Sequence, residues 1–203
     1  MPDPTDADVA TVSERLAEQG IDVVRVSYPD MIGVDRGRDV LLGELGTAVS
    51  HGLAFCRAVY HTSPMGDVVP VQGGLEEGLP DITVRPDLTT LTPLPWEQGA
   101  AWCLGNALTP DGAPAPESPR TVAHRVAGQF TSLGYTLVCG PELEFFLCEP
   151  APGGGWQRYA NDLGNVYVVG RKGDPQGVLV DMLRQLRDAG LRVTAANHEF
   201  SPG

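Results

Sequence analysis

Apolar residues recur at helical spacing near the start of the chain. Val9, Val12 and Leu16 stand three and four residues apart, so they would share one face of a helix. Gly20 suits the position just after a helix, because glycine readily adopts a positive φ. The pattern therefore predicts an amphipathic helix over residues 5–20.

Strand-like segments follow this helix. Residues 21–28 (IDVVRVSY) are rich in β-branched side chains, which favour a strand. Turn-forming residues fill 29–38 (PDMIGVDRGR), and a second apolar stretch begins at 39–42, so we expect a β-hairpin. A further strand is predicted over 100–108, after an extended region punctuated by proline.

One pattern occurs twice in the second half of the chain: a capped amphipathic helix, a glycine, an apolar strand and then a carboxylate. Ser118–Pro119 and Asp174–Pro175 each suit the start of a helix, where a side-chain oxygen caps the backbone and proline is tolerated. Gly134 and Gly190 suit the two helix ends. The predicted strands cover residues 135–139, 142–148 and 191–195.

The strand predicted over 142–148 carries two neighbouring carboxylates. Glu142 and Glu144 would lie on one face, about 7 Å apart. Two carboxylates in a half-buried place repel each other, and a divalent cation with a preference for oxygen ligands would offset that cost. Glu199 supplies a third carboxylate, with His198 beside it. Alternate glutamates also mark the solvent-facing side of an ordinary sheet, so the spacing alone leaves both interpretations open.

Composition narrows the functional classes. The chain has 203 residues and a net charge of −12, which argues against binding to nucleic acid or an anionic membrane. No run of 18 apolar residues occurs, so we expect no membrane-spanning helix. The acidic residues 1–8 lack the basic start of a signal peptide, and we therefore expect a cytoplasmic protein.

The segment 140–147 (GPELEFFL) resembles the signature of the glutamine synthetases, the glutamate–ammonia ligases. Asn197-His198-Glu199 is similar to the His-His-Glu motif of that family. Further segments resemble its small N-terminal β-grasp domain and the connection to its catalytic domain: residues 24–26, 30–33, 36–38, 85–91 and 95–96.

The resemblance covers roughly residues 20–203 and implies an α+β fold. Residues 1–20 would form an N-terminal helix, and residues 21–110 a β-grasp-like domain with its connection. Residues 111–203 would form the first part of the catalytic domain, an antiparallel sheet with helices.

The resemblance also implies an activity in glutamine biosynthesis and nitrogen metabolism. Family members use ATP to convert the γ-carboxylate of glutamate to γ-glutamyl phosphate, from which ammonia displaces phosphate. Two or three Mg²⁺ or Mn²⁺ ions take part. By position, Glu142 matches a ligand of the nucleotide-side metal, and Glu144 and Glu199 match ligands of the glutamate-side metal. His198 would lie behind these ligands or near the nucleotide. Ring-shaped homo-oligomers with active sites between subunits are implied as well.

Three departures from the family pattern leave alternatives open. The chain ends at Gly203, before further metal-, phosphate- and glutamate-binding residues, so we expect it to be inactive by itself. Residues 62–78 replace the loop whose aspartate binds ammonium, and Asp67 is the candidate substitute. Asn197 stands where a histidine is usual. The alternatives are a γ-glutamyl–amine ligase of the polyamine type, and an inactive fragment that only binds metal or docks onto full-length subunits.

Overall fold

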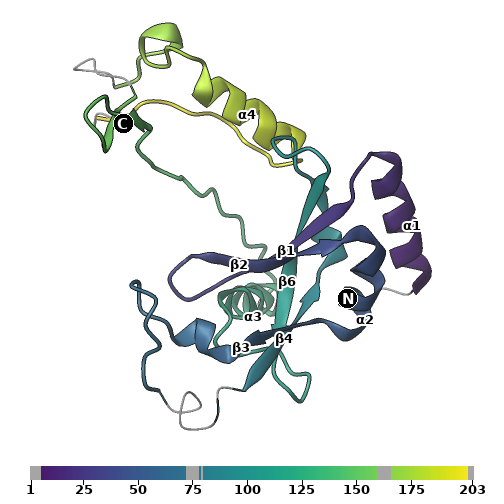
Figure 1. Ribbon diagram of the computed structural model, residues 1–203. Helices are drawn as coiled ribbons and strands as arrows, with labels where there is room; N and C mark the ends of the chain where they lie inside the picture. Colours follow the sequence, from purple (N-terminus) through teal and green to yellow (C-terminus); the bar gives the residue numbers. More distant parts are fainter. Residues whose placement is uncertain (1–5, 72–77, 79, 160–165, 201–203) are drawn as a thin grey trace. The chain divides into compact units, whose positions relative to one another are not determined.

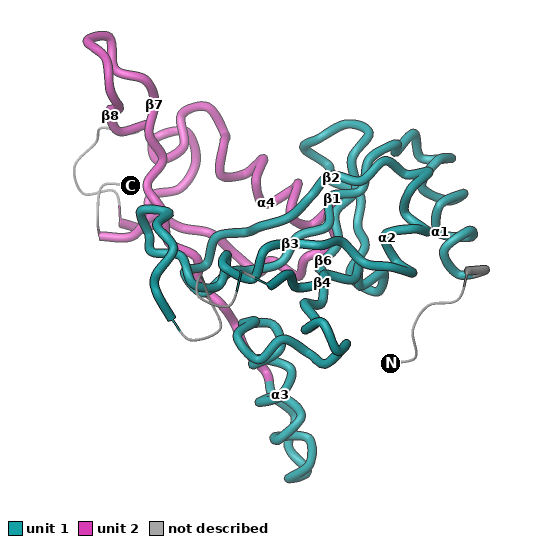
Figure 2. The backbone as a smooth tube through the Cα atoms, turned by 60° about the horizontal axis from the view of Figure 1, so that its bottom comes forward, with its two compact units in different colours: residues 1–137 teal, residues 138–203 magenta. Residues whose placement is uncertain are grey.

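The computed structural model describes residues 6–71, 78, 80–159 and 166–200. The chain divides into two compact units, residues 1–137 and 138–203, which Figure 2 distinguishes by colour. This division falls later than the domain boundary expected at residue 110. Each unit is described by itself.

The first unit is built on a mixed sheet with the strand order β2-β1-β6-β4-β3 (Figure 1). Strands β1 and β6 pair in parallel, with Val23 opposite Ala100, and the other pairs are antiparallel. The short strand β5 pairs with β6 beside this path. The strands are β1 (Val23–Pro29), β2 (Asp35–Leu41), β3 (Leu53–Cys56), β4 (Asp81–Pro86), β5 (Thr92–Pro93) and β6 (Ala100–Leu108).

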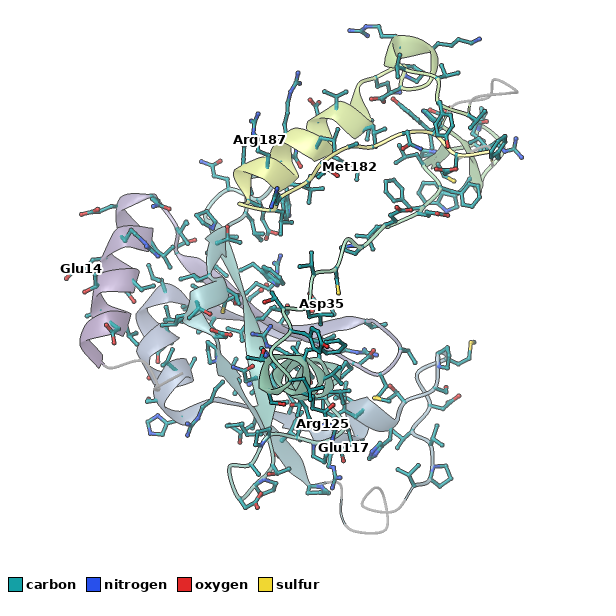
Figure 3. All side chains as sticks on the ribbon, turned by 180° about the vertical axis from the view of Figure 1, so that it is seen from behind. Glu14, Asp35, Glu117, Arg125, Met182 and Arg187 are labelled. Atoms are coloured by element: carbon teal, nitrogen blue, oxygen red, sulfur yellow. The ribbon has the colours of Figure 1, made fainter. Side chains whose placement is uncertain are left out.

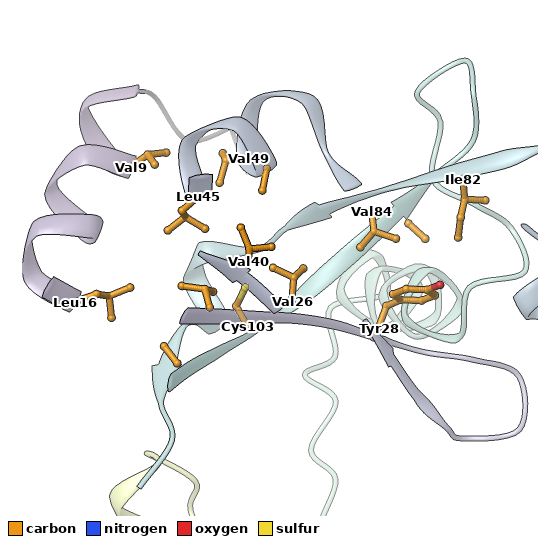
Figure 4. Close-up of a cluster of buried hydrophobic side chains, with 14 of the residues drawn as sticks. Val9, Leu16, Val26, Tyr28, Val40, Leu45, Val49, Ile82, Val84 and Cys103 are labelled. Carbon is orange, nitrogen blue, oxygen red and sulfur yellow. The ribbon is translucent and has the colours of Figure 1, made fainter. Parts of the chain in front are cut away.

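Two helices pack on this sheet and close the core (Figure 4). They are α1 (Asp6–Glu18) and α2 (Leu45–His51), and α1 confirms the helix predicted from the apolar spacing. Short 3₁₀ turns complete the unit: η1 (Leu42–Glu44), η2 (Arg57–His61) and η4 (Leu88–Thr90). The core side chains come from both layers and include Val9, Leu16, Val24, Val26, Val40, Leu45, Ile82 and Val84. The α+β fold class is thereby confirmed.

The predicted hairpin is confirmed, and one buried carboxylate organises its turn. Asp30 is 2% exposed, and its Oδ1 accepts hydrogen bonds from the backbone N–H groups of Ile32 (3.0 Å) and Val34 (2.9 Å). Its Oδ2 accepts from Nε of Arg36 at 2.8 Å. Burial acts to raise the pKa of Asp30, but the hydrogen bonds from Val34, Arg36 and Ile32 outweigh it, so the pKa is lowered.

Helix α3 (Pro119–Ser132) also begins where the sequence predicts. Ser118 is its N-cap and accepts a hydrogen bond from the backbone N–H of Thr121 at 3.5 Å. None of its residues is buried within the part of the chain that the structure describes, and Phe130 and Leu133 are exposed. The apolar stripe seen in the sequence is thus present but uncovered here.

The second unit contains one α-helix and one hairpin among its described residues. Helix α4 (Val178–Asp188) follows the turn η5 (Gly170–Lys172), and β7 (Cys148–Pro150) pairs antiparallel with β8 (Trp156–Arg158). The strands predicted over 135–139 and 191–195 are wrong, and only the end of the one predicted over 142–148 lies in a strand. A strand needs a neighbour for its backbone groups, and the described chain offers these segments none.

Across the ranges that the structure covers, no helix is both long and apolar enough to cross a membrane.

We predict that Asp30→Asn lowers the free energy of unfolding at pH 7 by about 1.5–3 kcal/mol, because the turn loses charge-assisted hydrogen bonds. A lowered pKa in the folded state stabilises above the usual value of about 4 and loses that effect as the pH falls through the folded value. The difference from wild type should therefore shrink in acid, as measured by urea unfolding at pH 7 and pH 3.

The matched control is Asp35→Asn, an exposed aspartate of the same hairpin that Figure 3 labels. It should change the stability little at either pH. Equal effects of the two variants at pH 7 would contradict the role given to Asp30.

Candidate functional site

The three predicted metal-binding carboxylates all belong to the second unit. Glu142 and Glu144 lie in the irregular segment before β7, and Glu199 lies in the segment after α4. All three side chains are exposed. Within the described ranges, no group of three or more His, Cys, Asp or Glu side chains is arranged to hold a metal ion. The structure thus does not bring these carboxylates together, and their metal-binding role stays a prediction.

The alternation expected at Glu142 and Glu144 is also missing. Because residues 141–147 do not form a strand, Leu143 and Phe146 are exposed like the glutamates. A two-faced arrangement requires pleated backbone paired to a neighbour. The carboxylates therefore lie on an extended, unpaired segment instead of one wall of a sheet.

The segment 197–199 is held by a short loop. The backbone N–H of Tyr167 donates to the carbonyl of His198 at 3.0 Å, and the Asn197 amide donates to the Glu199 carboxylate at 2.9 Å. Nε2 of His198 is buried and unpaired. A Cβ atom added to Gly173 would lie 2.7 Å from this nitrogen, so the imidazole rests directly on the glycine backbone.

This arrangement makes Gly173 a residue that the sequence analysis missed. Any side chain at that position would displace the His198 ring or the loop itself. Tyr167 has a positive φ of 58°, which few non-glycine residues adopt. The conformation of the loop is therefore dictated by its contacts with residues 197–199 and with α4.

Asp174 connects this loop to helix α4. Its Oδ1 accepts from the backbone N–H of Val178 at 2.8 Å, and its Oδ2 from that of Leu179 at 3.1 Å. The hydroxyl of Tyr159 donates to Oδ1 at 2.9 Å and accepts from the N–H of Gln176 at 2.7 Å. Burial acts to raise the pKa of Asp174, but these hydrogen bonds prevail and the pKa is lowered.

The predicted cap at Asp174 is thus confirmed, whereas Tyr159 was missed. Tyr159 follows β8 and no local pattern relates it to residues fifteen positions later. Together the two side chains join the β7–β8 hairpin, the loop and α4 into one support for residues 197–199. This support is the best-ordered polar arrangement near the predicted site residues.

Asp67, the candidate amine-binding residue, lies in the first unit. It closes a tight turn in which the backbone N–H of Ser63 donates to the Asp67 carbonyl at 2.8 Å. The N–H of Asp67 donates to the Ser63 hydroxyl at 3.2 Å, and the Asp67 side chain is exposed. The turn is flanked by the bridge between Thr62 and Val68. Its carboxylate therefore faces solvent and is available to a ligand.

Comparison with known proteins gives a consistent result. The family model described as "Glutamine synthetase, catalytic domain" matches residues 116–203. The γ-glutamylethanolamide synthetase GlnA4 of Streptomyces coelicolor is 30% identical over 199 residues, which cover 93% of this chain and 43% of that protein. The glutamine synthetase of Halobacterium salinarum is 25% identical over 196 residues, covering 95% and 41%. A glutamate–isopropylamine ligase of a Pseudomonas species is 26% identical over 208 residues, covering 96% and 44%.

A solved structure has the same fold. The structure titled "Apo GmaS without ligand" has a TM-score of 0.64 at 18% identity and is matched over 88% of this chain and 40% of that one. The chain spans about two fifths of the length of the curated relatives it matches.

We predict that Tyr159→Phe weakens the support for residues 197–199. The variant removes one hydroxyl that donates to Asp174 and accepts from Gln176, which should cost about 1 kcal/mol locally. Amide hydrogen exchange measured by NMR should become faster in residues 166–180. Tyr135→Phe, at an exposed tyrosine of the first unit, is the control and should leave these amides unchanged. Unaltered exchange in Tyr159→Phe would contradict the proposed link.

Proposed function

Because the chain belongs to the glutamine synthetase family, we propose that the complete protein is an ATP-dependent ligase. It joins the γ-carboxylate of glutamate to ammonia or an amine and forms a γ-glutamyl amide. The observation that carries this proposal is the match of residues 116–203 to the catalytic domain, which includes the GPELEFFL segment.

The donor set fits the divalent cations that such a ligase uses. Glu142, Glu144 and Glu199 offer only oxygen ligands, which Mg²⁺ and Mn²⁺ prefer to nitrogen or sulfur. We assign Glu142 to the metal on the nucleotide side, and Glu144 and Glu199 to the metal on the glutamate side, with two or three ions per site. When bound, these cations neutralise phosphate charge and so favour phosphoryl transfer from ATP.

The remaining residues position these ligands. His198 lies between Glu199 and the loop that carries Tyr167 and Gly173, so it fixes the backbone from which the Glu199 carboxylate projects. Asp174 and Tyr159 hold that loop to α4. We assign Asp67 to the ammonium or amine, because an exposed carboxylate attracts a cationic acceptor before the acceptor loses its proton.

A second candidate function differs only in the acceptor. The 30% identical relative is named for γ-glutamylethanolamide, and another relative is named for isopropylamine. These names favour a primary amine over ammonia as the acceptor of this protein. In either case, we propose a cytoplasmic homo-oligomer whose active sites lie between subunits, working in glutamine biosynthesis or, with an amine acceptor, in related nitrogen metabolism.

We predict that Glu144→Gln in the complete protein lowers kcat at least 100-fold, because a metal ligand and its charge are lost. The measurement is phosphate release from ATP that depends on both glutamate and an acceptor, at saturating Mn²⁺. Glu149→Gln is the matched control: its carboxylate accepts from Gln157 at 2.8 Å, and glutamine retains an acceptor there. Equal activity of the two variants would contradict the assignment of Glu144.

The acceptor is identified by the same assay with ammonia, ethanolamine, isopropylamine and aniline. We expect kcat/KM to be highest for a primary alkyl amine, with γ-glutamyl amide detected by mass spectrometry. A preference for ammonia would return the protein to glutamine synthesis. No glutamate-dependent phosphate release with any acceptor would leave the inactive, metal-binding role.

A further inference from the structure

Four buried polar atoms in the first unit have no hydrogen-bond partner within the described chain. They are the hydroxyls of Tyr28 and Tyr60, Nδ1 of His61 and Oε2 of Glu117. Strand β1 carries Tyr28, the turn η2 carries Tyr60 and His61, and Glu117 stands just before α3, where Figure 3 labels it. We propose that these four atoms enclose a buried hydration site that holds one or two ordered water molecules.

Several contacts show that the four atoms form one cluster. The rings of Tyr28 and Tyr60 meet edge to face with centroids 5.9 Å apart. Nε of Arg57, on the same turn η2, donates to Oε1 of Glu117 at 2.8 Å, which leaves Oε2 unpaired. The carboxyl of Glu117 is within electrostatic range of both His61 and Tyr60.

The Tyr60 hydroxyl is not satisfied by its nearest neighbour. Burial raises the pKa of Tyr60, the adjacent Ser118 hydroxyl opposes this rise, and the Glu117 carboxylate adds to it. Ser118 is occupied as the N-cap of α3, where its oxygen accepts from the N–H of Thr121. The geometry between the two hydroxyls makes no hydrogen bond, so Tyr60 remains unpaired.

Leaving these groups dry would be costly. Tyr28 is 1% exposed and Tyr60 is 3% exposed, so their hydroxyls do not reach bulk solvent. Each buried polar group without a partner reduces the folding equilibrium constant by a factor of roughly 5 to 150. Buried groups of this kind in native proteins are normally bridged by internal water, which makes about three hydrogen bonds.

The charges select a neutral occupant. Glu117 is already paired with Arg57, and the neighbouring Asp30 is paired with Arg36, so no net charge remains to hold an ion. The described residues also contain no group of three His, Cys, Asp or Glu side chains suited to a metal. A carboxylate oxygen only accepts hydrogen bonds, whereas a tyrosine hydroxyl also donates. Water both donates and accepts, and it matches this set.

The site would connect the sheet to two neighbouring elements. Water between these atoms links β1 to η2 and to the residue before α3. The turn η2 ends at His61, and the turn that carries Asp67 begins there. The hydration site therefore fixes the base of that turn, and this inference does not depend on the proposed enzymatic activity.

Tyrosine-to-phenylalanine variants of the 203-residue chain test the proposal by the sign of their effect. If water bridges the hydroxyls, Tyr60→Phe should reduce the folding equilibrium constant about 5-fold or more in urea unfolding. Tyr28→Phe and the double variant complete a cycle that should reveal coupling, because both hydroxyls would share water. Tyr135→Phe, at an exposed tyrosine, is the control and should be neutral.

A neutral or stabilising effect of Tyr60→Phe would overturn the proposal, because removing a truly unpaired hydroxyl is favourable. A second measurement does not depend on the variants. Oxygen-17 relaxation dispersion of the wild-type chain counts long-lived internal water, and nuclear Overhauser contacts assign it to the Tyr60 ring. Detection of such water supports the site, and its absence beside Tyr60 overturns it.

Discussion

The parallel pairing of β1 with β6 is the constraint on which the first unit depends. It joins strands that are far apart in the sequence, so everything between them must form the crossover, including α2, β3 and β4. Close packing at the centre requires a glycine: a Cβ atom at Gly105 would lie 2.2 Å from Cγ1 of Val84. Once these strands are paired, β2 extends the sheet on one side, β4 and β3 extend it on the other, and α1 and α2 pack over the core.

The same need to pair backbone groups explains the second unit. Residues 135–147 and 191–199 carry strand-like sequences, yet they remain irregular because no described segment lies beside them. What orders this unit instead is side-chain chemistry. Asp174 gathers the first N–H groups of α4 and the hydroxyl of Tyr159, and the loop it anchors holds His198.

Buried polar groups are treated in two ways in this protein. Asp30 and Asp174 each collect at least three hydrogen bonds, and both acids have lowered pKa values despite their burial. Tyr28, Tyr60 and Glu117 instead retain unpaired atoms at the meeting point of three elements. A carboxylate in a turn or cap is satisfied by nearby backbone, whereas groups brought together from distant segments need a bridging molecule.

The sequence by itself determined the features that depend on neighbours along the chain. Helix α1, the β1–β2 hairpin, the caps at Ser118 and Asp174 and the family-specific GPELEFFL segment all follow from local spacing and turn chemistry. Only the tertiary structure decided which strand-like segments are paired, because pairing depends on a distant partner. For the same reason the link from Tyr159 to Asp174, the fit of His198 on Gly173 and the cluster around Tyr60 were beyond reach, since each joins residues that no sequence period relates.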